Sequence, residues 1–502
     1  MKLSDLLKRD EIISVKGPDR EISSIVYHSE KASKDSLFFA IDGQFHQGTD
    51  HIREAAAKGA AAVAVAGDKK DCMTGKDKDS LTVVRVPNVR RALALASSRM
   101  YNNPSGKLLV IGVTGTKGKT TTAFMIRQIL QESGIKTGII GTVENGYDGH
   151  MAKANATTPQ PPEINSLLAE MAENGCRAAV IEVSSQGLMH SRIDGIDIDI
   201  GVFTNISPDH IGKGEHRNFR EYLQWKSTLF QKCRWAVANI DDPHTPEILK
   251  NSHLEKTVFF GENGSGDLVA DDISLKIENG FPVTTYMLSA RLPGKNRTVR
   301  PIKVNMAGRF NVENSLAAIG TARLLGVPWK HIDSAMEKIR VPGRVEIVRV
   351  NAGFTAMVDY AHNGIALRNL LESLREYRPE RIILVFGCGG NRDPGRRREM
   401  AMAAAGYADT IIITSDNPRR EDPMKIIGDI TSAVNETDVL HEKQVLIIPD
   451  RKEAIETALN TAGKGDFAVI AGKGHETYQI IGTKVLHFDD REVILSWRKD
   501  EP

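Results

Sequence analysis

The chain has 502 residues, of which 26% are charged and 41% hydrophobic, and its formal net charge is +2 at pH 7. This composition is typical of a globular protein with about two to four domains. The near-neutral charge excludes a strong field that would attract nucleic acid or a membrane surface. The N-terminus, MKLSDLLKRDEIIS, lacks a secretion signal, and no apolar run approaches the roughly 18 residues of a membrane span. We therefore expect a cytoplasmic protein that binds neither nucleic acid nor membrane.

The first predicted unit covers residues 1–104 and is a small α/β domain. Residues 36–41 (SLFFAI) and 60–66 (AAAVAVA) are expected to be strands, and residues 51–59 (HIREAAAKG) a helix closed by glycine. The charged, turn-rich segment 67–80 is interpreted as a solvated loop.

The second predicted unit, residues 105–340, opens with the strand pattern KLLVIGVTG at 107–115. Strand and helix patterns then alternate, which favours a parallel, doubly wound sheet. Residues 259–304 are expected to form short polar strands, and residues 307–326 a helix.

The third predicted unit, residues 341–502, begins at VPGRVEIV, a Pro-Gly turn followed by a strand. Five further strand patterns follow it, separated by helices. The predicted fold class is therefore α/β with three domains: a small N-terminal domain, a central parallel-sheet domain with a phosphate loop, and a C-terminal Rossmann-like domain. The four cysteines (Cys72, Cys176, Cys233 and Cys388) are scattered without a CxxC pair, which favours reduced thiols over a zinc site.

The segment GVTGTKGKTTT, residues 112–122, lies between a predicted strand and a predicted helix. Its glycines let backbone N–H groups turn toward a phosphate, and the helix N-terminus adds positive potential. Lys119 is placed to reach the β- and γ-phosphates, and Thr120 to offer its hydroxyl to Mg²⁺. Val113 stands where the strict Walker pattern has glycine, and the alternative is a plain strand-to-helix turn.

Two further strand patterns end in hard metal ligands. Glu182 closes one strand, and Asp209 and His210 follow another. Carboxylates together with phosphate oxygens and water suit Mg²⁺. Lys226 falls on a predicted helix at 221–230, where composition alone favours a solvated lysine.

Several motifs occur along the chain in the order typical of one family: GTKGKTT, EVSSxxL, FTNxxxDH, GRFNVENSLAA, PGRVE, VDYAH, GCGGNRD and AGKGHE. Through these motifs the chain resembles the Mur ligase and folylpolyglutamate synthetase superfamily over nearly its whole length. The resemblance implies three α/β domains that close around ATP, a UDP-linked muropeptide and an amino acid. It implies phosphorylation of a carboxylate by ATP, followed by displacement of phosphate by an amine to form an amide.

The resemblance also assigns residues to ATP and two Mg²⁺ ions. The implied ATP contacts are Gly115, Thr116, Lys117, Gly118, Lys119, Thr120, Thr121, Asn311, Arg344 and Asp359. The implied catalytic and metal-binding residues are Lys119, Thr120, Glu182, His210 and Lys226, the last as a carbamate.

The segment IIITSDNPRRED, residues 411–422, is a strand that ends in a polar loop. A planar arginine can donate two parallel hydrogen bonds to a carboxylate, an aspartate or asparagine can accept from an ammonium, and proline restricts the loop between them. Without context, an Asx-Pro turn with a solvated arginine is the favoured explanation of the pattern. DNPR, however, resembles the recognition motif of Mur ligases that add meso-diaminopimelate. The amino-acid contacts that the resemblance implies are Arg392, Asp416, Asn417, Pro418, Arg419, Gly472 and Glu476.

The predicted site for the UDP-linked acceptor departs most from the family pattern. His28-Ser29-Glu30 replaces Asp-Ser-Arg, Ala156-Thr157-Thr158 replaces Asn-Thr-Thr, and His190 replaces the commoner glutamine. The implied contacts to the UDP-muropeptide are Tyr27, Ser29, Gln44, Phe45, His46, Ala156, Thr157, Thr158, Ser184, His190 and Arg192.

Three functions remain open at this point. The first is an ATP-dependent ligase that adds meso-diaminopimelate to UDP-MurNAc-L-alanyl-D-glutamate, acting as a monomer. The second is the same chemistry with another amino acid such as L-lysine, or with another acceptor such as folate. The third is a non-catalytic Mur-like binding module, against which Lys119, Glu182, His210 and Lys226 argue.

Overall fold

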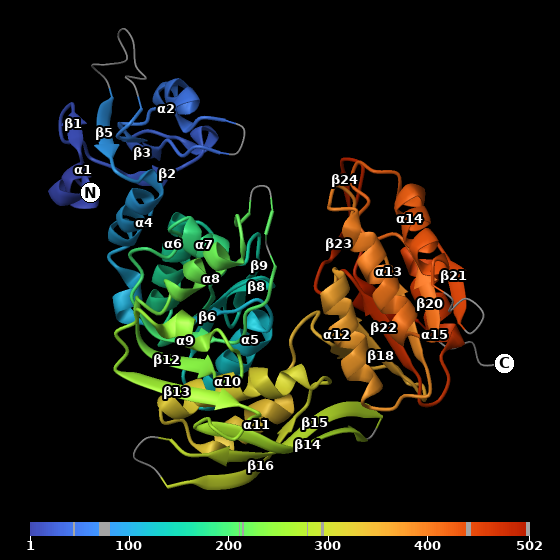
Figure 1. The fold of residues 1–502 in the computed structure, drawn as a ribbon. Coiled ribbons are helices and arrows are strands. Elements are labelled where there is room, and N and C mark those ends of the chain that lie inside the picture. The colour runs from blue at the N-terminus through green and yellow to red at the C-terminus, as the bar shows by residue number, and fades with distance from the viewer. Residues whose placement is uncertain are drawn as a thin grey trace. The chain divides into compact units, whose positions relative to one another are not determined.

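The structure is a computed structural model, and it describes residues 1–43, 46–69, 81–209, 211–212, 215–278, 280–292, 296–437 and 443–497. The chain forms two compact units. One consists of Met1–Asp267 and Ala317–His331, and the other of Leu268–Leu316 and Ile332–Pro502. The predicted division into three domains, with boundaries at 104 and 340, differs from this division into two units and stays a prediction. Figure 1 shows the fold coloured along the chain.

The N-terminal part of the first unit is a five-stranded sheet in the order β1-β5-β4-β3-β2, parallel except for β1. Apolar residues on one face of the sheet pack against α1 and α4, and those on the other face pack against α2. Asn88 caps α4 by accepting from the N–H of Arg91, which fixes where the helix begins. The elements are α1 (Leu3–Leu6), β1 (Ser14–Lys16), β2 (Ser24–Val26), β3 (Ser36–Phe39), α2 (Ile52–Ala57), β4 (Ala62–Ala66), β5 (Thr82–Val86) and α4 (Val89–Met100).

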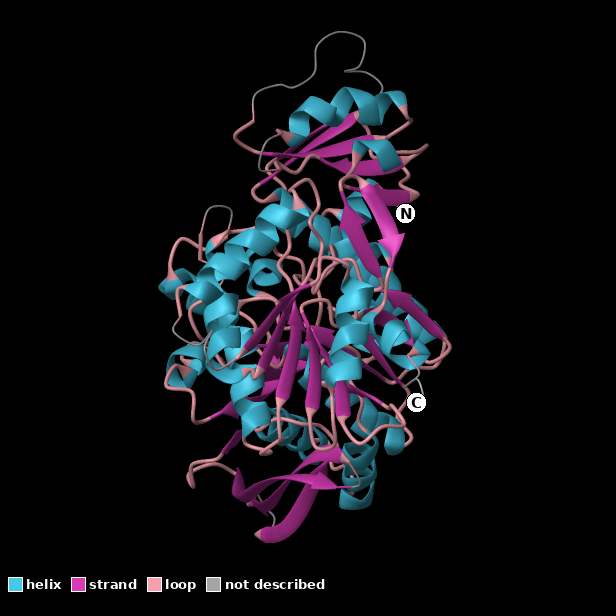
Figure 2. Ribbon diagram, turned by 90° about the vertical axis from the view of Figure 1, so that its right-hand side faces the viewer, coloured by secondary structure: helices cyan, strands magenta, loops and turns pink. Residues whose placement is uncertain are grey.

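The larger sheet of the first unit has the order β13-β12-β11-β6-β10-β7-β8-β9. Strands β13 to β7 in this order are parallel, and β7, β8 and β9 are antiparallel. Figure 2 shows these strands between helices. The carboxyl ends of β6, β10 and β11 meet at one edge, where open parallel sheets bind ligands. The strands are β6 (Leu109–Thr114), β7 (Thr137–Ile140), β8 (Glu144–Tyr147), β9 (His150–Lys153), β10 (Ala178–Glu182), β11 (Ile198–Phe203), β12 (Cys233–Asn239) and β13 (Lys256–Gly261). The helices are α5 (Lys119–Glu132), α6 (Pro161–Glu173), α7 (Ser185–Met189), α8 (Phe219–Ser227) and α9 (Thr245–Leu249).

The second unit contains three antiparallel strands, a six-stranded sheet in the order β17-β18-β22-β19-β20-β21, and a hairpin. In the six-stranded sheet only β17 is antiparallel. The strands are β14 (Leu268–Glu278), β15 (Phe281–Ala290), β16 (Thr298–Val304), β17 (Glu346–Val348), β18 (Thr355–Asp359), β19 (Ile382–Phe386), β20 (Thr410–Ile413), β21 (Gln444–Ile447), β22 (Phe467–Ala471), β23 (Tyr478–Ile481) and β24 (Lys484–His487). The helices are α12 (Gly364–Arg375), α13 (Gly395–Tyr407), α14 (Pro423–Asn435), α15 (Arg451–Thr461) and α16 (Asp490–Ser496). The chain passes between the two units within α10 (Phe310–Leu324) and α11 (Trp329–Lys338).

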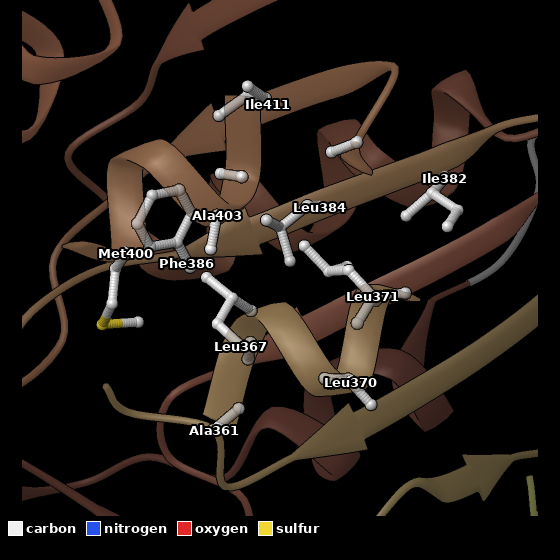
Figure 3. Close-up of a cluster of buried hydrophobic side chains, with 14 of the residues drawn as sticks. Ala361, Leu367, Leu370, Leu371, Ile382, Leu384, Phe386, Met400, Ala403 and Ile411 are labelled. Atoms are coloured by element: carbon white, nitrogen blue, oxygen red, sulfur yellow. The ribbon is translucent and has the colours of Figure 1, made fainter. Parts of the chain in front are cut away.

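One face of the six-stranded sheet carries the main core of the second unit (Figure 3). Leu367, Leu370 and Leu371 recur at helical spacing on α12 and are buried, as are Leu384 and Phe386 on β19. Side chains three and four residues apart lie on one face of a helix, so α12 turns an apolar stripe toward the strands. This packing fixes the sheet whose loops carry the predicted amino-acid site.

The predicted α/β fold class is confirmed. One prediction in it is wrong in detail: the strands between 259 and 304 are not short, because β14 has 11 residues and β15 has 10. The hairpin of β8 and β9 was not predicted. Among the helices that the structure describes, none is both long and apolar enough to cross a bilayer. Three of the four cysteines (Cys176, Cys233 and Cys388) are free and buried, and Cys72 and most of segment 67–80 lie outside the described residues.

Candidate active site

The loop between β6 and α5 has the backbone shape of a phosphate loop. A Cβ at Gly115 would lie 1.9 Å from Oγ1 of Thr204, and Gly118 has a left-handed φ of +85° at the N-cap of α5. The N–H of Thr116 donates to the carbonyl of Asn205 (2.8 Å), which ties the loop to the end of the neighbouring strand. The first N–H groups of α5 have no acceptor inside the helix, so they are suited to bind phosphate.

Lys119, Thr120 and Glu182, three residues predicted from sequence, lie at this sheet edge. Nζ of Lys119 donates to the carbonyl of Gly115 (2.9 Å), and Oγ1 of Thr120 donates to Oε2 of Glu182 (2.9 Å). Glu182 is fully buried at the end of β10. Its Oε1 accepts from the N–H of Thr142 (2.8 Å) and its Oε2 from the hydroxyl of the same threonine (3.0 Å). The structure therefore brings together the strand-end carboxylate of Glu182 and the hydroxyl of Thr120 at the start of α5.

Thr142 is a site residue that the sequence reasoning missed. It follows β7 after Gly141, and a Cβ at Gly141 would lie only 2.2 Å from Oε1 of Glu182. A Gly-Thr pair directly after a buried parallel strand was the available signal, because β7 ends at the same sheet edge.

Lys226 is not the solvated lysine that composition favours. Its side chain on α8 is 1% exposed, and Nζ donates to the carbonyl of Gly115 (2.8 Å) and lies 4.7 Å from the ring centre of Tyr222. Burial, followed by the positive charge of Lys119, holds the pKa of Lys226 well below its usual range, although Asp209 opposes the shift. Burial at this position therefore favours the neutral amine over the ammonium.

The donor set at this edge suits a hard cation. The hydroxyl of Thr120 and the carboxylate of Glu182 are oxygen ligands of the kind that Mg²⁺ takes alongside phosphate and water. Within the described part of the chain, no three histidine, cysteine, aspartate or glutamate side chains form a metal cluster, and His210 lies outside that part. The residues present thus fit Mg²⁺ held largely by phosphate oxygens.

A pocket of about 500 Å³ lies in the first unit and is lined by three predicted acceptor residues, Tyr27, Ser29 and His46. The hydroxyl of Tyr27 donates to Oε1 of Glu163 on α6 (2.6 Å), which links the N-terminal sheet to the central one. Arg90 also lines the pocket and was missed, because nothing in its helical context marks it as a ligand. Two predicted residues, Gln44 and Phe45, lie outside the described residues.

Four predicted acceptor residues lie beside Glu182. Oγ1 of Thr158 donates to the carbonyl of Glu182 (2.8 Å), and Thr158 in turn accepts from Arg192 through its own carbonyl (2.7 Å). Ser184 caps α7, and the hydroxyl of Thr157 lies 3.0 Å from that of Thr142. The predicted acceptor loop and the predicted metal ligand therefore adjoin.

Ala156 and His190 complete the predicted acceptor set. Ala156 is exposed at the bend before Thr157. Burial, aided by the charges of Arg90 and Arg192, lowers the pKa of His190 to about 4. His190 is therefore neutral at physiological pH.

The second unit holds three predicted ATP contacts: Asn311 on α10, Arg344 in the turn before β17, and Asp359 at the end of β18. Asn311 is fully buried on α10. The guanidinium of Arg344 lies 4.6 Å from the ring centre of Tyr360. Asp359 accepts from the N–H of Val345 (2.7 Å), and burial raises the pKa of its carboxyl. Asp359 thus secures the turn that carries Arg344.

Arg419, in the DNPR loop after β20, does not extend into solvent. It is partly buried, its Nη1 donates to the carbonyl of Gly390 (2.9 Å), and its backbone N–H donates to the carbonyl of Ile480 on β23 (3.0 Å). Its φ of +54° is in the left-handed region, which costs a non-glycine residue about 1 kcal/mol. The side chain of Arg419 is therefore held against the neighbouring loop and is not freely solvated.

The other residues of the predicted amino-acid site converge on the same loop. Nδ2 of Asn417 donates to Oε2 of Glu476 (2.8 Å), and a Cβ at Gly472 would lie 2.7 Å from Oδ2 of Asp416. Arg392 is exposed on the loop after β19. The oxygen of the Asn417 amide accepts from the N–H of Ile480 (2.9 Å), and the negative charge that could attract an ammonium comes from Asp416 and Glu476.

A buried ion pair at the end of β22 was not predicted. Arg451, fully buried, donates to both carboxylate oxygens of Asp490 (2.8 and 2.7 Å) and to the carbonyl of Ala471 (3.1 Å). Burial acts to lower the pKa of Arg451, but the charge of Asp490, with those of Asp416 and Glu476, raises it overall. The pair therefore anchors the end of β22, where the glycine-rich segment begins.

Comparison with known proteins matches three family models along the chain. They are the Mur ligase family catalytic domain at residues 21–101, the Mur ligase middle domain at 113–322, and the Mur ligase glutamate ligase domain at 343–474. A protein of Caldanaerobacter subterraneus subsp. tengcongensis, named UDP-N-acetylmuramoyl-L-alanyl-D-glutamate--2,6-diaminopimelate ligase, is 38% identical over 98% of each chain. A protein of the same name from Clostridium tetani is 39% identical over 98% of each chain. A solved structure of a ligase of this name has a TM-score of 0.67 at 29% identity and covers 95% of this chain and 94% of its own.

Proposed function

Because this chain belongs to the Mur ligase family, we propose that it is the ATP-dependent ligase that joins meso-2,6-diaminopimelate to UDP-N-acetylmuramoyl-L-alanyl-D-glutamate. The observation that carries the choice of amino acid is the DNPR loop. This loop carries the guanidinium of Arg419 and the carboxylate of Asp416. The carboxylate of Glu476 is hydrogen-bonded to the same loop through Asn417.

The distal end of diaminopimelate carries both an ammonium and a carboxylate, whereas that of L-lysine carries only an ammonium. The planar guanidinium of Arg419 can donate two parallel hydrogen bonds to the distal carboxylate. Asp416 and Glu476 supply negative charge for the ammonium. L-lysine would leave the arginine without an anion, so the loop favours diaminopimelate by charge.

The chemistry needs two steps, because a carboxylate is a poor acyl donor. An oxygen of the acceptor carboxylate attacks the γ-phosphorus of ATP and ADP leaves; the amine then attacks the acyl carbon and phosphate leaves. Lys119 and the first N–H groups of α5 bind the phosphates and stabilise the charge on the transferring group. Thr158, Ser184 and Arg192 position the acceptor beside this loop.

Mg²⁺, when bound, neutralises charge on the transferring phosphoryl group. We assign Thr120, Glu182, His210 and Lys226 to two Mg²⁺ sites. Lys226 would serve as a carbamate: its amine, in the neutral form that burial favours, adds CO₂ and loses a proton, which gives an anion at this buried position. We further propose that the enzyme is a cytoplasmic monomer.

A phosphate-release assay tests this function. With ATP and the UDP-dipeptide present, phosphate release should require an amino acid, and meso-diaminopimelate should give a much higher kcat/KM than L-lysine. A higher kcat/KM for L-lysine would show that L-lysine, and not meso-diaminopimelate, is the amino-acid substrate. Release that depends on neither acceptor nor amino acid would refute a ligase and leave a binding module.

A further inference from the structure

Lys473 lies beneath the predicted amino-acid site and has no role in the function proposed above. It follows Gly472 in the segment AGKGHE, and its side chain is 0% exposed. A buried ammonium is costly unless all three of its donors find acceptors. Nζ lies near three: the carbonyl of Tyr478 (2.5 Å), Oε2 of Glu476 (3.3 Å) and Oδ1 of Asn417 (3.5 Å).

These contacts decide how the amide of Asn417 is oriented. The oxygen faces two donors, the ammonium of Lys473 and the N–H of Ile480, so the NH₂ group must face Glu476. Turning the amide over would set its NH₂ against both donors and its oxygen against a carboxylate. Oε2 of Glu476 therefore accepts from Lys473 and Asn417 together, and the hydroxyl of Tyr478 also interacts with this carboxylate.

We propose that Lys473 is a positioning residue for the diamino acid: its buried ammonium holds Glu476 and Asn417 in the single arrangement that receives the substrate ammonium. This inference rests on the proposed function for the location of the amino-acid site. Lys473 would repel a substrate ammonium if it reached it directly, so it acts through Glu476 rather than by contact. Its loss should therefore weaken amino-acid binding and spare the other two substrates.

Lys473→Met tests this, because methionine fills a similar volume without charge or donors. We expect the KM for meso-diaminopimelate to rise about tenfold or more, as for a lost hydrogen bond to a charged group, while the KM values for ATP and the UDP-dipeptide stay within about twofold. Lys484→Met is the matched control, because Lys484 lies exposed on β24 of the same unit. If the methionine variant does not fold, Lys473→Gln keeps a donor for the Tyr478 carbonyl and removes the charge.

A double-mutant cycle separates positioning from general support. If Lys473 acts through Glu476, adding Lys473→Met to Glu476→Gln should change the amino-acid KM by less than about twofold. An unchanged KM in the single variant, or equal rises for all three substrates, would overturn the proposal. If the wild-type protein uses L-lysine and not diaminopimelate, the proposed substrate is wrong, and the same comparison with L-lysine still decides the role of Lys473.

Discussion

Replacing Arg419 with methionine removes the guanidinium proposed to bind the distal carboxylate of diaminopimelate while keeping most of the side-chain volume. Each hydrogen bond to a charged group contributes about 1.5–3 kcal/mol. Allowing for partial exposure of the site, we expect a loss of about 2–4 kcal/mol, which is roughly a 30- to 700-fold fall in kcat/KM at about 1.4 kcal/mol per tenfold.

The substitution also removes the hydrogen bond from Nη1 of Arg419 to the carbonyl of Gly390. Any loosening of the loop would lower activity with every amino acid, so the informative quantity is the ratio of kcat/KM for meso-diaminopimelate to that for L-lysine. Phosphate release with saturating ATP and UDP-dipeptide gives both values. Arg420→Met, at the exposed neighbouring position, is the control. A ratio that is the same in wild type and Arg419→Met would refute the charge-based selection.

Three further outcomes follow from buried features of the structure. Asp490→Ala leaves Arg451 buried without its partner and should lower the free energy of unfolding, measured in urea, by about 3–5 kcal/mol. Glu436→Ala, which breaks an exposed pair, should lower it by at most about 1 kcal/mol. Equal losses in the two variants would contradict this expectation. Gly115→Ala places a Cβ against the hydroxyl of a threonine. It should lower the free energy of unfolding by about 1–3 kcal/mol and raise the KM for ATP. An unchanged KM for ATP would contradict the loop geometry. The pKa of His190 falls to about 4 on folding, so its neutral form stabilises the fold above about pH 6.5, and that contribution is lost as the pH falls through about 4. The free energy of unfolding of His190→Gln should therefore fall less over this range than that of the wild type. Parallel curves of the free energy of unfolding against pH for the two proteins would contradict this expectation.

The parts of the site that the sequence predicted lie at the ends of buried strands and in glycine turns. Glu182 and the DNPR loop each follow an apolar run, and parallel strands bring their carboxyl ends to one edge. Gly115 and Gly118 are fixed by local backbone geometry, which sequence patterns record directly. Such features depend on one element and its immediate neighbour.

The parts that escaped prediction depend on the register of elements far apart in the chain. Thr142 is hydrogen-bonded to Glu182, 40 residues further along the chain, and Arg451 to Asp490, 39 residues further along. Neither pair has a local pattern, since each residue by itself resembles an ordinary polar residue. Strand β14 was underestimated for another reason: most of its residues are exposed or half-buried, so it lacks the apolar run that marks a long strand.

A structure of this protein with meso-diaminopimelate bound is the most direct measurement of its selectivity. We expect the guanidinium of Arg419 to donate to the distal carboxylate, with the distal ammonium against Asp416 or Glu476. A bound diamino acid whose distal carboxylate faces water, with the guanidinium of Arg419 still donating to the carbonyl of Gly390, would contradict the account.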